Sequence, residues 1–114
     1  MPYIDLKTTA KVTKEKEIAL KAAFGKAIEL IPGKSERWLM VRLADECKMF
    51  LAGDNKDEIA MVEIDIFGSA ADAAYDALTE RACDILNEEL SIKKDKIYVK
   101  YREVDHWGWN GENF

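Results

Sequence analysis

The stretch Val62-Glu63-Ile64-Asp65-Ile66 decides the fold, because its apolar and acidic side chains alternate strictly. A period of two sends successive side chains to opposite faces, so the stretch predicts a strand with one buried face. Gly68-Ser69 ends this strand, and Ser69 is expected to cap the helix that follows. That helix carries apolar residues at helical spacing, namely Ala71, Tyr75, Leu78, Ala82 and Ile85.

A second strand is predicted after this helix, from Ile97 to Val104. Its side chains alternate, with Ile97, Val99 and Tyr101 on one face and Tyr98, Lys100 and Arg102 on the other. The downstream half of the chain therefore reads as strand, helix, strand.

The upstream half repeats this order. A strand from Tyr3 to Thr8 precedes a helix that Thr13 can cap, with an apolar stripe at Leu20, Phe24, Ala27 and Ile31. Pro32-Gly33 ends the helix, Trp38 to Leu43 reads as the next strand, and a turn is expected at Gly53-Asp54-Asn55.

Two such βαβ units predict an α+β two-layer sandwich, in which a mixed four-stranded sheet carries both helices on one face. Each unit favours a parallel pair of strands joined by a right-handed crossover. Residues 1–114 are expected to form one domain. The other face of the sheet stays uncovered, and self-association would cover it.

Composition excludes several classes of function. The chain is 48% hydrophobic and has a formal net charge of −5, which argues against a nucleic-acid surface. No segment approaches the about 20 apolar residues of a membrane span, and the N-terminus lacks the features of a signal peptide. The expected location is the cytoplasm, with export by a signal-less route left open. No metal cluster or phosphate-binding loop is apparent, so no metal and no cofactor are expected.

Pro2 is the first residue with possible chemistry. Methionine aminopeptidases generally remove Met1 before a proline, which would leave a secondary amine at the start of a strand. An α-amine has an ordinary pKa of about 7.7–8.0, and desolvation or a nearby cation lowers it toward the range of a general base at neutral pH. A proline after methionine is also common at strand starts, so Pro2 alone does not establish this role.

Other residues carry two interpretations each. Lys34 is either a cation near the strand ends or a partner of the helix dipole. Lys100 either faces a ligand or discourages aggregation at a sheet edge. The tail Trp107-Gly108-Trp109-Asn110 and the terminal Phe114 form either core packing or the wall of a pocket or subunit contact. His106 is expected to be structural or exposed.

Together these features resemble the macrophage migration inhibitory factor (MIF) family of the tautomerase superfamily. The resemblance spans essentially the whole chain. It rests on the opening Met-Pro, Gly33-Lys34 after the first helix, Phe67-Gly68 before the second, Ile97-Tyr98-Val99, and Gly108-Trp109-Asn110 near Phe114. The combination of Pro2, Gly33-Lys34 and Gly-Trp-Asn is specific, whereas each motif alone is weak.

The resemblance implies a homotrimer with active sites at the subunit interfaces. It assigns the catalytic base to Pro2, a contact with the substrate's carboxylate or carbonyl to Lys34, and a backbone amide facing the substrate to Phe67. It implies that Tyr98 comes from the neighbouring subunit and that Trp109 and Phe114 are apolar walls.

The sequence departs from the mammalian cytokine at two of these positions, with Lys100 in place of an asparagine and Phe67 in place of an isoleucine. Lys100 is expected to lower the pKa of Pro2 and to favour a substrate that bears a carboxylate. The Cys-x-x-Cys motif linked to thiol redox activity is absent, with Lys56-Asp57-Glu58-Ile59 in its neighbourhood. That activity is not expected here.

The expected function is keto–enol tautomerisation of a small-molecule keto acid such as phenylpyruvate. A decarboxylase or hydratase of the same superfamily ranks lower, because Arg37, Arg42 and Arg102 are not at positions that can be placed in the pocket from the sequence. A trimeric binding or cytokine-like protein with vestigial tautomerase activity is the alternative from a different class.

Overall fold

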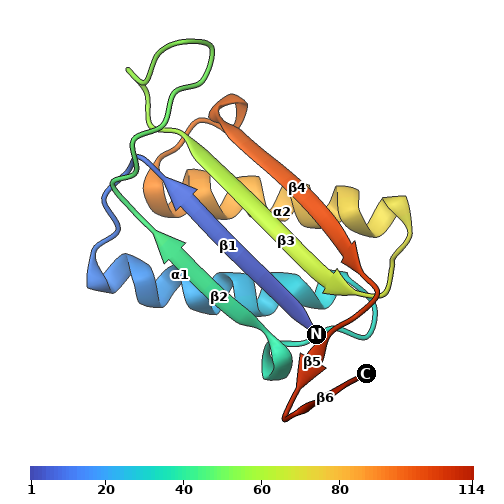
Figure 1. The fold of residues 1–114 in the computed structure, drawn as a ribbon. Helices are drawn as coiled ribbons and strands as arrows, with labels where there is room; N and C mark the ends of the chain where they lie inside the picture. Colours follow the sequence, from blue (N-terminus) through green and yellow to red (C-terminus); the bar gives the residue numbers. More distant parts are fainter.

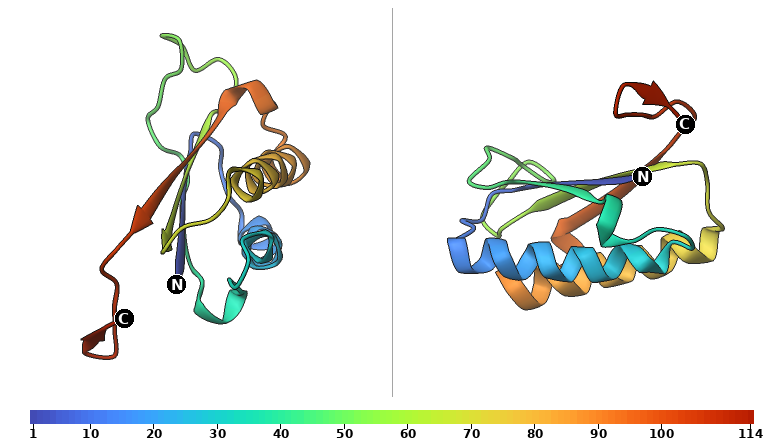
Figure 2. Two further views of the ribbon diagram at one scale, coloured as in Figure 1. Left: turned by 90° about the vertical axis from the view of Figure 1, so that its right-hand side faces the viewer. Right: turned by 90° about the horizontal axis from the view of Figure 1, so that it is seen from below.

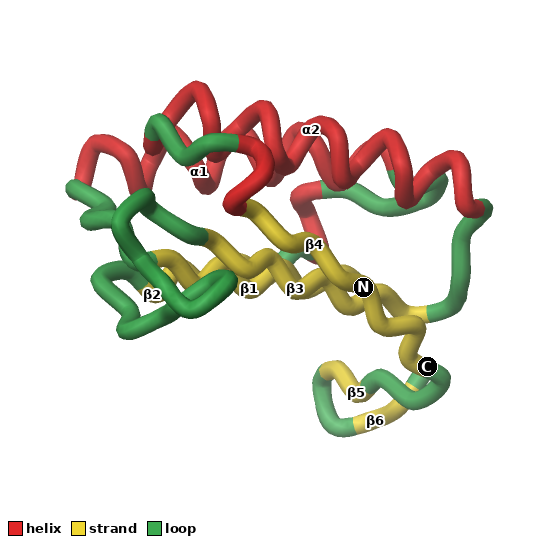
Figure 3. Tube along the Cα trace, turned by 90° about the horizontal axis from the view of Figure 1, so that it is seen from above, coloured by secondary structure: helices red, strands yellow, loops and turns green.

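The sheet of the computed structural model, which describes residues 1–114, contains four strands in the order β2-β1-β3-β4. These strands are β1 (Pro2–Thr8), β2 (Met40–Ala44), β3 (Ala60–Phe67) and β4 (Ile97–Val104). Helices α1 (Lys14–Ala27) and α2 (Asp72–Leu90) both lie on one face of the sheet, as Figures 1 and 2 show. The view from above in Figure 3 separates the helical layer from the strand layer.

The pairing of the strands confirms the predicted fold class. β1 and β2 are parallel, β3 and β4 are parallel, and β1 pairs antiparallel with β3. The antiparallel pair joins the two βαβ units in the centre of the sheet. In its register Pro2 lies opposite Ile66, and Thr8 lies opposite Ala60.

The helix starts were predicted with mixed success. The Thr13 side chain accepts a hydrogen bond from the Lys16 backbone N–H at 3.3 Å, which confirms the predicted cap. The predicted cap at Ser69 is wrong, because α2 begins at Asp72 after Ala71, which makes no side-chain capping bond. The chain needs the residues after Gly68 to cross from the sheet to the helical layer.

Strand β2, predicted from Trp38 to Leu43, also begins later than predicted. Residues Glu36–Trp38 form a single turn of 3₁₀ helix, η2, and β2 starts at Met40. Trp38 is therefore directed by a turn rather than by the pleat of a strand. Another short turn, η1 (Ile28–Leu30), follows α1, and the tight turn further on has Ala52 and Gly53 at positive φ between the bridged residues Leu51 and Asp54.

The core fills the space between the two helices and the covered face of the sheet. The strands supply the alternating apolar residues that the period of two predicts, and the helices supply their apolar stripes. Its largest fully buried side chains are Phe24, Ile4, Leu6, Leu20, Ile28, Ile31, Ile64, Ile66, Leu78, Ile85, Leu86 and Ile92. No helix combines the length and the apolar composition needed to cross a membrane.

The open face of the sheet is charged along its centre. Seven side chains from all four strands form a network that we call the charged ladder, comprising Asp5, Lys7, Arg42, Glu63, Asp65, Lys100 and Arg102. Ion pairs therefore cross from β2 through β1 and β3 to β4.

Lys7 holds the middle of the charged ladder. Asp5 and Glu63 lie directly opposite each other on β1 and β3, and like charges in that position repel. The Lys7 ammonium lies 2.7 Å from an Asp5 oxygen and 2.8 Å from a Glu63 oxygen. Lys7 is therefore the cation that makes the two carboxylates compatible, and it lowers the pKa of Glu63 more than any other group does.

Replacing Lys7 with methionine is expected to lower the free energy of unfolding by about 2 kcal/mol, because the largely buried carboxylates of Asp5 and Glu63 would lose a charged donor. Denaturant unfolding at one protein concentration measures this, with Lys21→Met on the exposed side of α1 as the matched control. The lowered pKa of Glu63 means that the wild type loses this stabilisation as pH falls through the folded-state pKa. The difference between wild type and K7M should therefore shrink in acid, and a constant difference would contradict the assignment.

The C-terminal residues form a small hairpin beyond the end of the sheet. Strands β5 (Gly108–Trp109) and β6 (Glu112–Asn113) are antiparallel, and the two turn residues Asn110 and Gly111 both have positive φ. An Asn-Gly pair adopts this conformation readily. The hairpin projects from the end of the sheet at which the N-terminus also lies (Figures 1 and 2).

Candidate functional site

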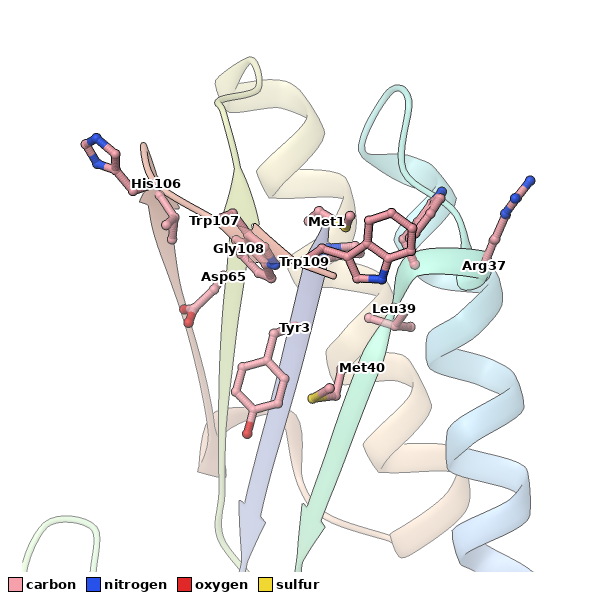
Figure 4. Close-up of a pocket in the computed structure, with 13 residues that line it drawn as sticks. Met1, Tyr3, Arg37, Leu39, Met40, Asp65, His106, Trp107, Gly108 and Trp109 are labelled. Atoms are coloured by element: carbon pink, nitrogen blue, oxygen red, sulfur yellow. The ribbon is translucent and has the colours of Figure 1, made fainter. Parts of the chain in front are cut away.

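The N-terminus, the C-terminal hairpin and the η2 turn meet at one end of the sheet. They surround a cavity of about 680 Å³, whose lining residues are drawn in Figure 4. Met1, Pro2 and Trp109 belong to this lining, while a neighbouring hollow of about 290 Å³ is lined by Met1, Phe67 and Phe114, among others. Of the seven predicted site residues, five therefore gather here or beside it, namely Pro2, Lys34, Phe67, Trp109 and Phe114.

The β1–β3 pairing fixes the position of the N-terminus. Pro2 is buried opposite Ile66 on β3. The backbone N–H of Phe67, the last residue of β3, donates a hydrogen bond to the Met1 carbonyl at 2.9 Å. The Met1 amino group has its pKa lowered to about 6, first by desolvation and then by the charge of Lys34 and a hydrogen bond with it. An amine at this position is therefore neutral at neutral pH.

A tight turn directs Lys34 toward the N-terminus at the end of β3. Gly33 adopts a φ of +81°, and the Lys34 backbone N–H donates to the Ile31 carbonyl at 3.0 Å. The Lys34 ammonium donates to the Phe67 carbonyl at 2.8 Å. Lys34 thus lies across from the end of β3 rather than on the last turn of α1, which ends at Ala27. Of its two interpretations, the cation near the strand ends is the one that the geometry supports.

Aromatic rings enclose this point. The Phe67 and Phe114 ring centroids are 5.7 Å apart, and the Trp109 and Phe114 rings stack at 6.3 Å. Trp38 and Trp109 pack edge to face, with ring centroids 5.2 Å apart and an interplanar angle of 89°. Trp109 and Phe114 nevertheless remain 53% and 56% exposed, so their rings form a wall that a ligand or another chain could still contact.

Tyr98 and Lys100 do not join this group within one chain. Tyr98 lies opposite Met61 on β3, whereas Pro2 lies opposite Ile66, and five residues of strand span about 17 Å. The Tyr98 side chain is exposed, and the Lys100 ammonium lies 3.5 Å from a Glu63 oxygen. These two residues could reach such a cavity only in another copy of the chain.

Several residues of the cavity were not predicted from the sequence, and Trp38 and Arg37 are the most informative of them. Trp38 was assigned to a strand, although its turn places it in the lining, and the aromatic signal Arg37-Trp38 after Gly33-Lys34 could have identified it. Arg37 could not be placed in the pocket from the sequence, and the structure includes it in the lining. Its guanidinium stacks on the Trp38 ring at 5.2 Å and points away from the Trp109 ring in Figure 4. His106 is exposed and also lies at the cavity.

The site has the parts of a proton-transfer centre. An amine of low pKa lies beside a cation, a backbone N–H at the end of β3 faces the same point, and apolar rings surround them. Nowhere does the structure gather three His, Cys, Asp or Glu side chains in a geometry that could hold a metal ion.

Comparison with known proteins agrees with this geometry. Residues 1–114 match the family model described as Macrophage migration inhibitory factor (MIF). The macrophage migration inhibitory factor of Xenopus laevis is 25% identical over 84 residues, which is 72% of each chain. The crystal structure of Leishmania major MIF2 covers 100% of this chain and 97% of its own, with a TM-score of 0.92 and 28% identity. A homologue from Prochlorococcus marinus covers 98% of both chains, with a TM-score of 0.88 and 25% identity.

The fold and these matches define a protein of the tautomerase superfamily. Within that superfamily, the chain belongs to the macrophage migration inhibitory factor family.

Replacing Lys34 with methionine is expected to raise the pKa of the N-terminal amine, because a nearby cation disfavours the protonated form. In the chain that retains Met1, the pKa should move from about 6 only part of the way toward the ordinary value, since desolvation remains. An NMR titration of the selectively labelled amine measures this, and Lys26→Met on the exposed end of α1 is the control. An unchanged pKa in K34M would show that Lys34 does not act on the amine.

Proposed function

We propose that the chain, once Met1 is removed, catalyses keto–enol tautomerisation of an α-keto acid such as phenylpyruvate, with Pro2 as the general base. The observation that carries this proposal is the position of Met1 between the Phe67 N–H and Lys34. The Met1 carbonyl accepts the Phe67 N–H at 2.9 Å, and its amine interacts with Lys34. Removal of Met1 would free both partners and create the secondary amine of Pro2 beside them.

The lowered pKa of the Met1 amine supports the basic role of Pro2. The Pro2 nitrogen would replace that amine one residue further along β1, and Pro2 is more buried than Met1. Burial and a neighbouring ammonium both lower the pKa of an amine, so Pro2 would be neutral at neutral pH. A neutral amine with a pKa near the working pH is suited to take and return a proton.

The Phe67 amide and Lys34 would bind the oxygens of the substrate. The Phe67 N–H already donates a hydrogen bond to a carbonyl oxygen, that of Met1, so a substrate oxygen could take the same place. The Lys34 ammonium donates one of its three protons to the Phe67 carbonyl, so its other protons can form hydrogen bonds with a substrate carboxylate. Charge that develops on the enolate oxygen would meet preformed donors there.

The aromatic walls support an aryl substrate. Trp38, Phe67, Trp109 and Phe114 present ring faces and edges around the amine, and a cavity of about 680 Å³ is large enough for a phenyl ring with a three-carbon acid. In the reaction, Pro2 would remove a proton from the carbon next to the keto group. The resulting ammonium would then deliver a proton to the enolate oxygen, so that the net change is an isomerisation.

We further propose that the active form is a homotrimer in which a neighbouring copy supplies Tyr98 and Lys100. Both residues lie far from Pro2 along the sheet of their own chain, and both are exposed on its open face. Three-fold assembly would bring such a face beside the cavity of another copy, and it would also shield the exposed Met40 and Trp109.

A binding or cytokine-like role is the second candidate, because the curated relatives that match this chain are named as migration inhibitory factors. Turnover by the purified protein separates the two candidates. A decarboxylase or hydratase role has weaker support, since the Arg37 guanidinium lies on Trp38 and points outward.

The first test is the intact mass of the natively expressed protein, followed by turnover of phenylpyruvate. A mass short by one methionine together with turnover is the expected result. A mass that includes Met1 would leave the Pro2 nitrogen acylated and remove the proposed base. Loss of Met1 without any turnover would favour the binding role.

Occupancy of the site by Met1 gives a matched pair of proteins. The same chain, expressed while methionine aminopeptidase is inhibited, should retain Met1 and lose tautomerase activity by about 100-fold or more, because it lacks both the base and the free Phe67 amide. Pro2→Gly keeps an N-terminal amine but loses the rigid secondary amine, and it should lose part of the activity. Circular dichroism and sedimentation should be unchanged, and full activity in the Met1 form would reject the role of Pro2.

A further inference from the structure

Glu63 connects three cations on the open face of the sheet. One carboxylate oxygen lies 2.8 Å from the Lys7 ammonium, and the other lies 3.5 Å from Lys100 and 3.6 Å from Arg102. Its side chain is only 17% exposed, so it is held more firmly than the lysine that it contacts on β4, whose side chain is 56% exposed. Glu63 therefore anchors a cation that otherwise extends into open space.

The register of the sheet makes this contact a fixed one. Glu63 and Lys100 are direct neighbours in the parallel β3–β4 pair, and both point to the open face. A free lysine side chain has many rotamers and loses conformational entropy when it is ordered. Because Glu63 already orders the Lys100 ammonium, less conformational entropy is lost when the substrate binds.

The charge of Lys100 is not cancelled by this contact. Glu63 shares its single negative charge among three cations, and Lys7 holds it at the shortest distance. The lowered pKa of Glu63, due mainly to Lys7, keeps the carboxylate ionised at neutral pH. Lys100 thus combines a defined position with a charge that can still attract an anion.

We propose that Glu63 is a positioning residue, which holds the Lys100 ammonium where it binds the carboxylate of a keto acid in the cavity of a neighbouring copy. This inference rests on the proposed function and names a residue that does not itself touch the substrate.

Two substitutions separate position from charge. Glu63→Gln removes the charge and weakens the anchor, whereas Glu63→Asp keeps the charge and withdraws the carboxylate by one methylene. In the processed protein, each should raise the KM for phenylpyruvate by about fivefold, which is the range of an exposed ion pair, and should leave kcat unchanged because Pro2 and Lys34 are untouched. The KM for phenylpyruvate methyl ester should not change.

The direction of the change in E63Q is decisive. If Glu63 acted only through its charge, its removal would make the surroundings of Lys100 more positive and would lower the KM for the acid. If it acted only on the stability of the sheet, the acid and the ester would change together. A lower KM for the acid, or equal changes for acid and ester, would overturn the proposal.

A double-mutant cycle connects the effect to Lys100. Lys100→Met should raise the KM for the acid by about tenfold, and adding Glu63→Gln should raise it no further, since the anchor would have nothing to hold. Additive effects would overturn the proposal. Glu29→Gln is the matched control, because Glu29 is exposed after α1 and enters no ion pair.

The outcomes also distinguish this inference from the proposed function. Absence of turnover in the processed wild type would reject the proposed function and with it this role of Glu63. Turnover by the wild type with an unchanged KM in both Glu63 variants would reject the positioning role alone. Because E63D keeps the ion pairs possible, it remains informative if E63Q fails to fold.

Discussion

The antiparallel pairing of β1 with β3 is the constraint on which the rest of the structure depends. It joins the two βαβ units, and its register sets Pro2 against Ile66 and the Met1 carbonyl against the Phe67 N–H. A slip of one residue would exchange the two faces of β1, exposing Ile4 and Leu6 and burying the charges of Asp5 and Lys7. The burial of the core therefore fixes the position of the N-terminus, and the chemistry at the N-terminus follows from the packing of the sheet.

The two faces of the sheet differ in chemical character. The covered face is apolar and packs against both helices, whereas the centre of the open face carries the charged ladder. A surface crossed by ion pairs is not driven to be buried by the hydrophobic effect, so contacts between copies would have to use the apolar groups at its margins. Trp109 at one end and Met40 on the edge strand are such groups. An assembly built in this way would leave Lys100 of the charged ladder free to reach the cavity of a neighbouring copy.

Much of the fold was predictable from the sequence, because it follows from local patterns. The alternation of Val62 to Ile66 and the cap at Thr13 are encoded within a few residues, and both were confirmed. Ser69 and Trp38 were misassigned, since the crossing between layers and the turn before β2 depend on the tertiary structure rather than on local spacing.

The candidate site was less predictable from the sequence than the fold. The meeting of Lys34 with Phe67, and the gathering of three cations on Glu63, join residues that are distant in the chain and reveal themselves only once the strands are in register. The roles proposed for Tyr98 and Lys100 would require a second copy of the chain, and the resemblance to the family, rather than a local pattern, suggested this for Tyr98.

The central claim is that a keto acid binds with its oxygen in the place of the Met1 carbonyl and its reactive carbon beside the Pro2 nitrogen. A crystal structure of the chain without Met1, with phenylpyruvate bound, tests this claim most directly. We expect a substrate oxygen within hydrogen-bonding distance of the Phe67 N–H and the Lys34 ammonium, the Pro2 nitrogen next to the substrate carbon, and Lys100 of another copy at the same cavity. A ligand bound away from Pro2, or a free Pro2 amine turned away from Lys34 and Phe67, would contradict it.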